Sequence, residues 1–196
     1  MPDYYCSECE EEFFDRSMVV APGPCQLCGA DETVSLAEDE HPPEPPTRQL
    51  DPRAEARAAA ETLLAEQGVS APPVDVVAIA EALGLQVSYS ALGDVDGELR
   101  GDRIRINRDH HPVRQRFTIA HELGHLRLHT SHGAGAVVER QAEVFAGALL
   151  VPPGLLRAAV VEQSDFEALR HRFEVSRPAL TIALREANLT GRVSNS

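Results

Sequence analysis

The segment 116–125 constrains this chain most strongly, because it places two histidines four residues apart within a helical pattern. Its sequence is RFTIAHELGH. On a helix, side chains at positions i and i+4 lie on one face with their Cβ atoms about 5–6 Å apart. His121 and His125 are therefore predicted to bind one catalytic zinc ion, with Glu122 beside them as general base. The alternative is a surface helix with two ordinary histidines.

A catalytic zinc site of this kind needs a third protein ligand, and a helix expected over 136–150 offers two carboxylates. Glu139 and Glu143 are four residues apart, so they share one face of that helix. Glu139 is predicted to complete the site and leave the fourth position to water. Glu143 is then expected to accept a hydrogen bond from a ligand imidazole. Because helix–helix register cannot be derived from one sequence, Glu143 stays open as the alternative ligand.

The four cysteines form a second metal motif near the N-terminus. Cys6 and Cys9 make one CxxC pair and Cys25 and Cys28 another, with fifteen residues between the pairs. This spacing is typical of a structural four-cysteine zinc site in a unit too small to fold without metal. We predict one structural zinc in a zinc-ribbon-like domain over 1–37. Two disulfides or a redox CxxC are the alternatives.

An acidic, proline-rich stretch follows the cysteines. Residues 1–46 contain twelve acidic residues and one basic residue, within a chain of net charge −13. Proline fixes φ and removes amide donors, so 38–50 is predicted to be an extended linker. Phosphate groups would repel so acidic a ribbon, and direct nucleic-acid binding by it is not expected. A protein-contacting or regulatory module is expected instead, and the alternative is that the acidity only confers solubility.

The remainder, 51–196, is predicted to be one α+β domain. Helices are expected at about 51–68, 74–83, 112–129 and 136–150, and strands at 85–89 and 103–107. Two short C-terminal helices are expected, one capped by Ser164 in a capping box with Glu167 and one capped by Ser176. The expected fold is a small twisted sheet packed on the helix of the two histidines, with further helices C-terminal. The alternation over 103–107 also predicts an exposed edge that binds an extended substrate by strand addition.

Composition gives an expectation about location. No uncharged apolar run approaches the about 18–20 residues that cross a bilayer, and the acidic N-terminus does not match a secretory signal. We therefore expect a cytoplasmic protein without a membrane partner.

Two motifs in fixed order resemble the ImmA/IrrE family of metallopeptidases. The first is the run 116–125, and the likeness covers about residues 70–190. The resemblance implies a zinc peptidase that acts on a helix-turn-helix repressor or antitoxin and thereby controls stress-response or mobile-element genes. It implies His121, His125 and Glu139 as zinc ligands and Glu122 as the catalytic residue. The second motif comprises Glu139, Ala142, Phe145, Ala146, Leu149, Leu150 and Pro152.

Two other functions stay open. One is a non-proteolytic, metal-containing regulatory protein that binds a repressor. The other is a DNA-binding regulator that uses its C-terminal helices. A helical tail packed on the peptidase core is favoured over the DNA-binding pair, because glutamates dilute its basic face. The arginines concerned are Arg170, Arg172, Arg177 and Arg185.

Overall fold

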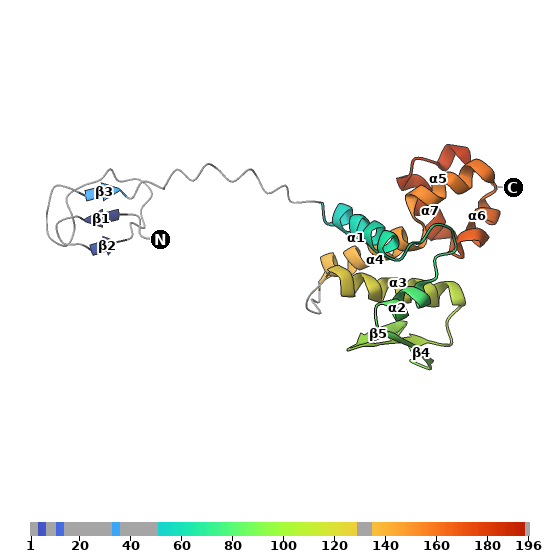
Figure 1. The fold of residues 1–196 in the computed structure, drawn as a ribbon, viewed down its shortest axis with the longest axis horizontal. Coiled ribbons are helices and arrows are strands. Elements are labelled where there is room, and N and C mark those ends of the chain that lie inside the picture. The colour runs from blue at the N-terminus through green and yellow to red at the C-terminus, as the bar shows by residue number, and fades with distance from the viewer. Residues whose placement is uncertain (1–3, 7–10, 14–32, 36–50, 129–134, 195–196) are drawn as a thin grey trace. The chain divides into compact units, whose positions relative to one another are not determined.

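The computed structural model describes residues 4–6, 11–13, 33–35, 51–128 and 135–194. The chain divides into two compact units, Met1–Arg48 and Gln49–Ser196. In the first unit, three short strands form an antiparallel sheet in the order β2-β1-β3 (Figure 1). These strands are β1 Tyr4–Cys6, β2 Glu11–Phe13 and β3 Thr33–Ser35.

The predicted ribbon site and linker fall on residues that are not described. Cys9, Cys25, Cys28 and the segment 38–50 lie outside the described residues, as does the side chain of Cys6. The structural zinc and the linker therefore stay predictions.

The second unit contains a mixed three-stranded sheet whose central strand is the last in sequence. β4 and β6 run parallel, β5 and β6 run antiparallel, and the order is β4-β6-β5. Ile104 and Ile106 are fully buried, because the alternation of β6 places both on the face that packs against the helices. The two predicted strands are confirmed, whereas β5 was not predicted. The strands are β4 Gln86–Ser90, β5 Gly97–Arg100 and β6 Arg103–Asn107.

The predicted exposed edge at 103–107 is wrong. β6 has a hydrogen-bonded strand on each side, so its backbone has no free edge to which a substrate strand could be added. The edge strand on one side is β5. The buried side chain of Asn107 donates hydrogen bonds to the carbonyls of Gly93 and Val95, at 2.8 and 3.0 Å, and so fixes the loop that leads into β5.

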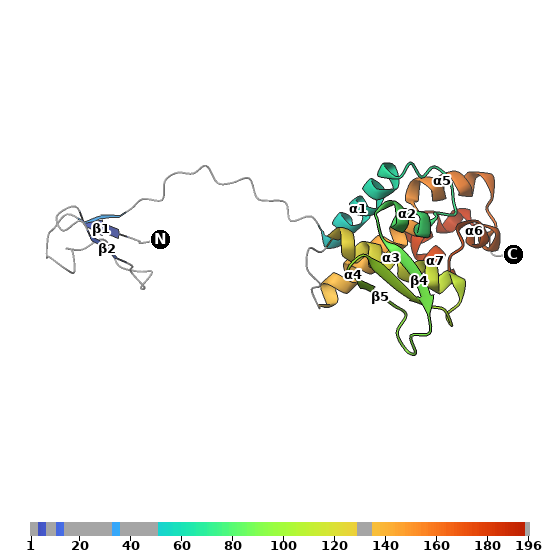
Figure 2. The same cartoon turned by 60° about the horizontal axis from the view of Figure 1, so that its bottom comes forward.

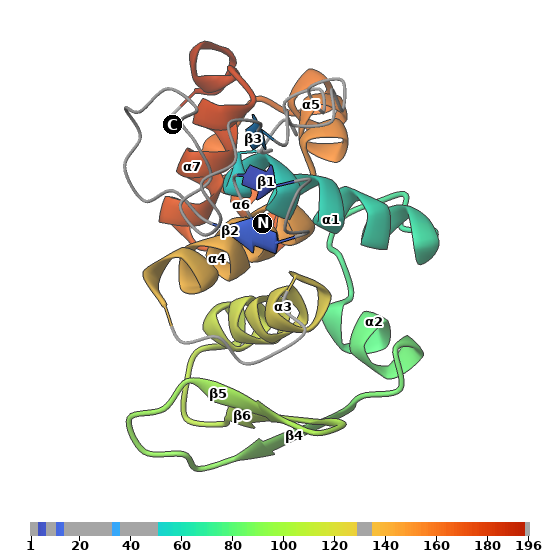
Figure 3. The same ribbon diagram turned by 90° about the vertical axis from the view of Figure 1, so that its left-hand side faces the viewer.

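The helix with the two histidines, α3, lies between the sheet and α4 (Figure 3). α1 packs against α4, and α2 lies beside α3 and β4 (Figure 2). Asp51 caps α1 and is followed by a proline in the first turn. All four helices lie in the ranges expected for them: α1 Pro52–Glu66, α2 Val76–Ala82, α3 Pro112–Leu128 and α4 Ala136–Leu150.

The C-terminal helices pack into the same core. Leu169, Phe173 and Leu180 are fully buried, which confirms a helical tail packed on the rest of the domain. These elements lie beyond α4 as seen from the sheet (Figure 3). They are α5 Pro153–Glu162, α6 Phe166–Phe173, α7 Arg177–Glu186 and the 3-10 helix η1 Thr190–Arg192.

Two local features of this tail differ from expectation. The carboxylate of Asp165, not the hydroxyl of Ser164, caps α6 by accepting a hydrogen bond from the N–H of Ala168 at 2.7 Å. α5 was not predicted, because a pair of prolines such as that after α4 usually marks a helix end. Pro153 occupies the first turn of α5, where the missing N–H costs no hydrogen bond. Ser176 caps α7 as predicted.

One described segment, Ala136–Glu162, is long and apolar enough to cross a membrane by length and composition, with a mean hydropathy of 1.9. It consists of α4 and α5, which separate at Val151 and Pro152. Half of its most apolar stretch of 18 residues is buried inside the domain. Buried core helices have the same composition, so the segment is weak evidence for a membrane span.

Candidate metal centre

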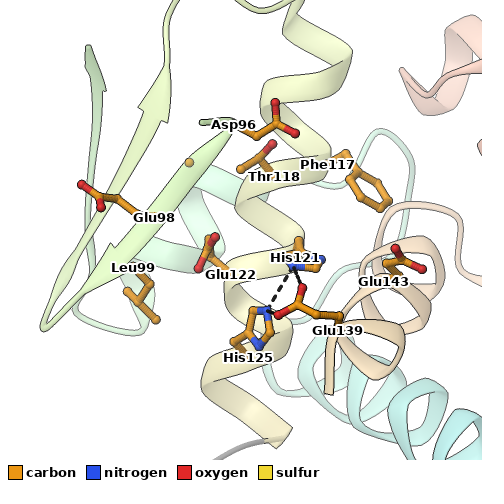
Figure 4. A pocket seen from close by; sticks show the side chains of 11 residues that line it. Asp96, Glu98, Leu99, Phe117, Thr118, His121, Glu122, His125, Glu139 and Glu143 are labelled. Carbon is orange, nitrogen blue, oxygen red and sulfur yellow. Dashed lines mark hydrogen bonds and ion pairs between the residues drawn. The ribbon is translucent and has the colours of Figure 1, made fainter. Parts of the chain in front are cut away.

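The two histidines of α3 project from one face toward each other (Figure 4). Nε2 of His121 lies 3.0 Å from Nε2 of His125. Their side chains are 19% and 20% exposed. Two imidazole nitrogens at this distance either share one hydrogen bond or bind one cation.

Glu139 of α4 completes a cluster of three possible ligands. Its carboxylate oxygens lie 3.3 Å from Nε2 of His121 and 3.5 Å from Nε2 of His125. The ligand atoms of all three residues lie within 4.8 Å of one another. Donors bound at zinc distances in a tetrahedron lie about 3.3–3.4 Å apart. The donor types and their spacing therefore fit one zinc ion with an open fourth position.

Gly124 sets the approach of α4 to these histidines. A Cβ at this position would lie 3.1 Å from the Cα of Ala142 and 3.1 Å from the ring of Phe145. The missing side chain lets the backbones of α3 and α4 come close together. Ala142 follows Glu139 by about one helical turn, so the glycine between the two histidines also helps to place the carboxylate of Glu139 beside them.

Glu122 lies beside the cluster, next to the edge strand β5 (Figure 4). Burial, together with the negative charges of Glu139 and Glu98, raises the pKa of Glu122 from 4.5 to about 7. A hydrogen bond donated by the backbone N–H of Leu99 opposes part of this rise. The carboxyl group can therefore both accept and donate a proton near neutral pH.

Gly97 allows β5 to lie close to α3. A Cβ on Gly97 would lie 2.6 Å from Cγ2 of Thr118 and 2.9 Å from the carbonyl oxygen of Arg105. Any side chain here would push the strand away from the helix, and with it the N–H of Leu99 that contacts Glu122. Neither Gly97 nor Leu99 was identified from the sequence. A glycine near the alternating segment 103–107 was the signal that could have indicated a close approach of the backbone.

These groups share a cavity of about 590 Å³, called the metal cavity below. It is open to solvent between β5, α3 and α4 (Figure 4), and its wall contains both polar and apolar parts. An extended peptide can therefore reach the cluster. Its lining residues are Asp96, Gly97, Glu98, Leu99, Phe117, Thr118, His121, Glu122, His125, Glu139 and Glu143.

Glu143 lines the metal cavity but lies outside the ligand cluster. Its carboxylate accepts a hydrogen bond from Nη1 of Arg140 at 2.9 Å. Among the described residues, none accepts a hydrogen bond from the buried Nδ1 of His121, which in zinc sites usually donates to a carboxylate or carbonyl. The predicted bond from a ligand imidazole to Glu143 stays a prediction.

The arginines that suggested DNA binding are largely engaged within the fold. Glu167 accepts a hydrogen bond from Arg170 at 2.7 Å and lies 2.9 Å from Arg177. The bond from Arg170 lowers the pKa of Glu167. Arg172 pairs with Glu162 at 2.6 Å. Three of the four arginines thus have a carboxylate partner, which reduces the positive field that a phosphate backbone would need.

Comparison with known proteins places this geometry in a family. The sequence model of the Peptidase M78 family, described as the IrrE N-terminal-like domain, matches residues 80–185. A search of curated proteins returned no match. Among solved structures, a Mycobacterium tuberculosis transcriptional regulator is similar, with 21% sequence identity and a TM-score of 0.51 over 64% of this chain and 44% of that chain. This identity shows the α+β fold alone, and the chain spans less than half the length of that regulator.

The family match includes the whole of α3 and α4, and therefore all three possible ligands and Glu122. The family resemblance predicted from the two motifs is confirmed. Because the match spans more than half of the chain, the protein belongs to the Peptidase M78 family of IrrE N-terminal-like metallopeptidase-type domains.

Proposed function

We propose that this chain is a zinc-dependent endopeptidase that cleaves a helix-turn-helix repressor or antitoxin. One observation carries the proposal: two histidines, a glutamate ligand and a second glutamate with a pKa of about 7 line one open cavity. Membership of a peptidase family supports the reaction. The substrate class rests on the resemblance to ImmA/IrrE proteins, and the similarity in fold to a protein described as a transcriptional regulator agrees with a regulatory role.

His121, His125 and Glu139 would hold the zinc ion. Two imidazoles and one carboxylate, with a fourth position left to water, are the ligand set of catalytic rather than structural zinc sites. A bound zinc ion lowers the pKa of its water toward about 7 and polarises the scissile carbonyl group.

Glu122 is the proton carrier in the proposed mechanism. It accepts a proton from the attacking water as the new C–O bond forms, and donates it to the peptide nitrogen as the C–N bond breaks. Its position beside the three possible ligands in the metal cavity suits both steps. The N–H of Leu99 holds the carboxylate in place between them, so β5 positions the residue that moves the proton.

The four cysteines are proposed to bind a second, structural zinc ion. The native chain should then contain two zinc equivalents, and a chain with Cys6 and Cys9 replaced by serine should contain one. Elemental analysis of the purified proteins measures both values. A second site that needs no cysteine would contradict this part of the proposal.

Glu122→Gln tests the peptidase itself. The variant keeps all three ligands, so its zinc content should equal that of the native chain while cleavage of a repressor substrate falls by about 10²–10⁴-fold. Cleavage products measured by mass spectrometry give the ratio. Undiminished cleavage by Glu122→Gln would overturn the mechanism. A biological response that survives in the variant would instead favour the non-proteolytic regulatory protein.

A further inference from the structure

A second cavity of about 500 Å³, called the apolar cavity below, lies next to the metal cavity. It is formed by the first half of α3, the end of α4, the turn between α6 and α7, and the first half of α7. Most of its wall is apolar, and its polar members are His111, Arg114 and Ser176. The apolar members that carry the argument are Val113, Phe117, Leu150, Val175, Ala179 and Ile182.

The two cavities share a wall. Phe117 lines both of them, and its ring is stacked on that of His121 with 6.3 Å between the centroids. Arg114 of the apolar cavity forms an ion pair of 2.7 Å with Asp96 of the metal cavity. A chain lying in the metal cavity can therefore continue past Phe117 into the apolar one.

The distance between the two cavities is that of a few peptide residues. Arg114 precedes His121 by seven residues, which is about 10 Å along the helix axis. An extended peptide advances about 3.3–3.6 Å per residue. A substrate bound at the metal therefore reaches the apolar cavity with its second to fourth residue from the scissile bond.

The lining of the apolar cavity favours an apolar side chain over a charged or polar one. Asp96 compensates the charge of Arg114, so the wall offers no net charge to a charged side chain. Ile182 lines the cavity and is 54% exposed. An apolar side chain would cover it, whereas a polar side chain would lose hydrogen bonds to water without replacement.

We propose that the apolar cavity is a specificity subsite that binds a large apolar side chain of the substrate, two to four residues from the scissile bond. The proposal rests on the peptidase function proposed above. It makes Phe117 and Ala179 specificity-determining residues and predicts that cleavage sites carry a leucine-like residue at that spacing.

Peptide hydroxamates test the subsite without any cleavage, because the hydroxamate fixes one end of the peptide on zinc. Two series, with the hydroxamate at the N-terminal or C-terminal end, carry leucine or alanine at the second, third or fourth residue. Their dissociation constants are measured on the zinc-loaded native chain and on Ala179→Phe, which fills the cavity. Thr181→Phe introduces the same side chain on the same helix, at a position that does not line the cavity, and serves as the control.

Leucine at one of these positions should tighten binding by about tenfold or more relative to alanine. Ala179→Phe should remove this difference and Thr181→Phe should keep it. Equal binding of leucine and alanine peptides in both series, or a preference that survives Ala179→Phe, overturns the subsite but leaves the peptidase proposal intact. Failure of every hydroxamate to bind zinc-loaded protein overturns both.

Discussion

The helix pairs α3–α4 and α6–α7 both gather charged side chains, but they use them in opposite ways. In α6–α7 three of the four arginines contact nearby carboxylates, so their charges are compensated within the fold. In α3–α4 two imidazoles and one carboxylate converge on a single point beside an open cavity. From the sequence, α3–α4 was a candidate zinc site and α6–α7 a candidate DNA-binding pair. The difference teaches that convergence on one point, rather than the number of charges, distinguishes a binding site from a stabilised surface.

The largest expected effect comes from removing one converging group. His125→Ala should lower zinc affinity by about 100-fold or more and abolish cleavage, because two ligands hold zinc poorly. Arg177→Ala, its match in α6–α7, should leave zinc affinity unchanged and cost less than about 1 kcal/mol of stability, since the side chain is 63% exposed. Titration with a competing chelator gives both affinities. An equal loss of zinc affinity in the two variants would contradict the difference between the helix pairs.

Gly124→Ala sharpens the comparison by moving a helix instead of a ligand. The added Cβ meets the backbone of α4 at 3.1 Å, so α4 must shift and carry Glu139 away from the histidines. Zinc affinity should fall by about tenfold, less than for loss of a ligand.

Gly147→Ala is the control for this substitution. Apart from the adjacent backbone of its own helix, no atom of the described structure would lie within 4 Å of a Cβ at this position. It should leave zinc affinity unchanged and raise helix stability by up to about 1 kcal/mol. A zinc affinity of Gly124→Ala equal to that of the control would show that the close approach does not place the third ligand.

The smallest effect concerns stability in the metal-free protein. The pKa of Glu122 is raised from 4.5 to about 7 in the folded chain, so the folded state holds this proton more tightly than the unfolded state. The free energy of unfolding should therefore fall as pH rises from about 4.5 to 7 and stay at the lower value above pH 7. A full shift of this size corresponds to about 3 kcal/mol, and because Glu122 is partly exposed to water we expect about 1–2 kcal/mol.

Glu122→Gln does not titrate and should escape this loss. Its stability advantage over the native chain should be near zero at about pH 4.5 and complete above about pH 7. Urea unfolding in the presence of a chelator measures the difference. Parallel stability curves for the two proteins would show that Glu122 titrates with an ordinary pKa.

Most of the fold was predictable because its helices are specified locally. α1, α3 and α4 have their own caps, apolar periodicity or stop residues, and α7 has its serine cap. β5 has no such pattern: it is a strand because it pairs with β6. The cap of α6 was displaced by one residue since Ser164 and Asp165 can both accept the orphan N–H bonds, and only the packed structure selects between them.

The candidate site divides in the same way. The spacing of His121 and His125 is a property of one helix, so the sequence alone predicted their convergence. Which of Glu139 and Glu143 lies beside the histidines depends on how two helices pack, and the close approach of Gly124 to Ala142 is part of that packing. The hydrogen bond from the backbone N–H of Leu99 to Glu122 could not be predicted, because every residue except proline has this donor and the residue type does not indicate its use.

The packing of α1 on α4 has a consequence for where this domain can be cut. The family match starts at residue 80, after the end of α1. Yet Ala56, Ala60 and Leu63 of α1 are fully buried, and Arg127 of α3 reaches back to Glu66 at 2.7 Å. A fragment trimmed to the matched segment would leave apolar surface of α4 open to water, so we expect a fragment that folds on its own to include α1.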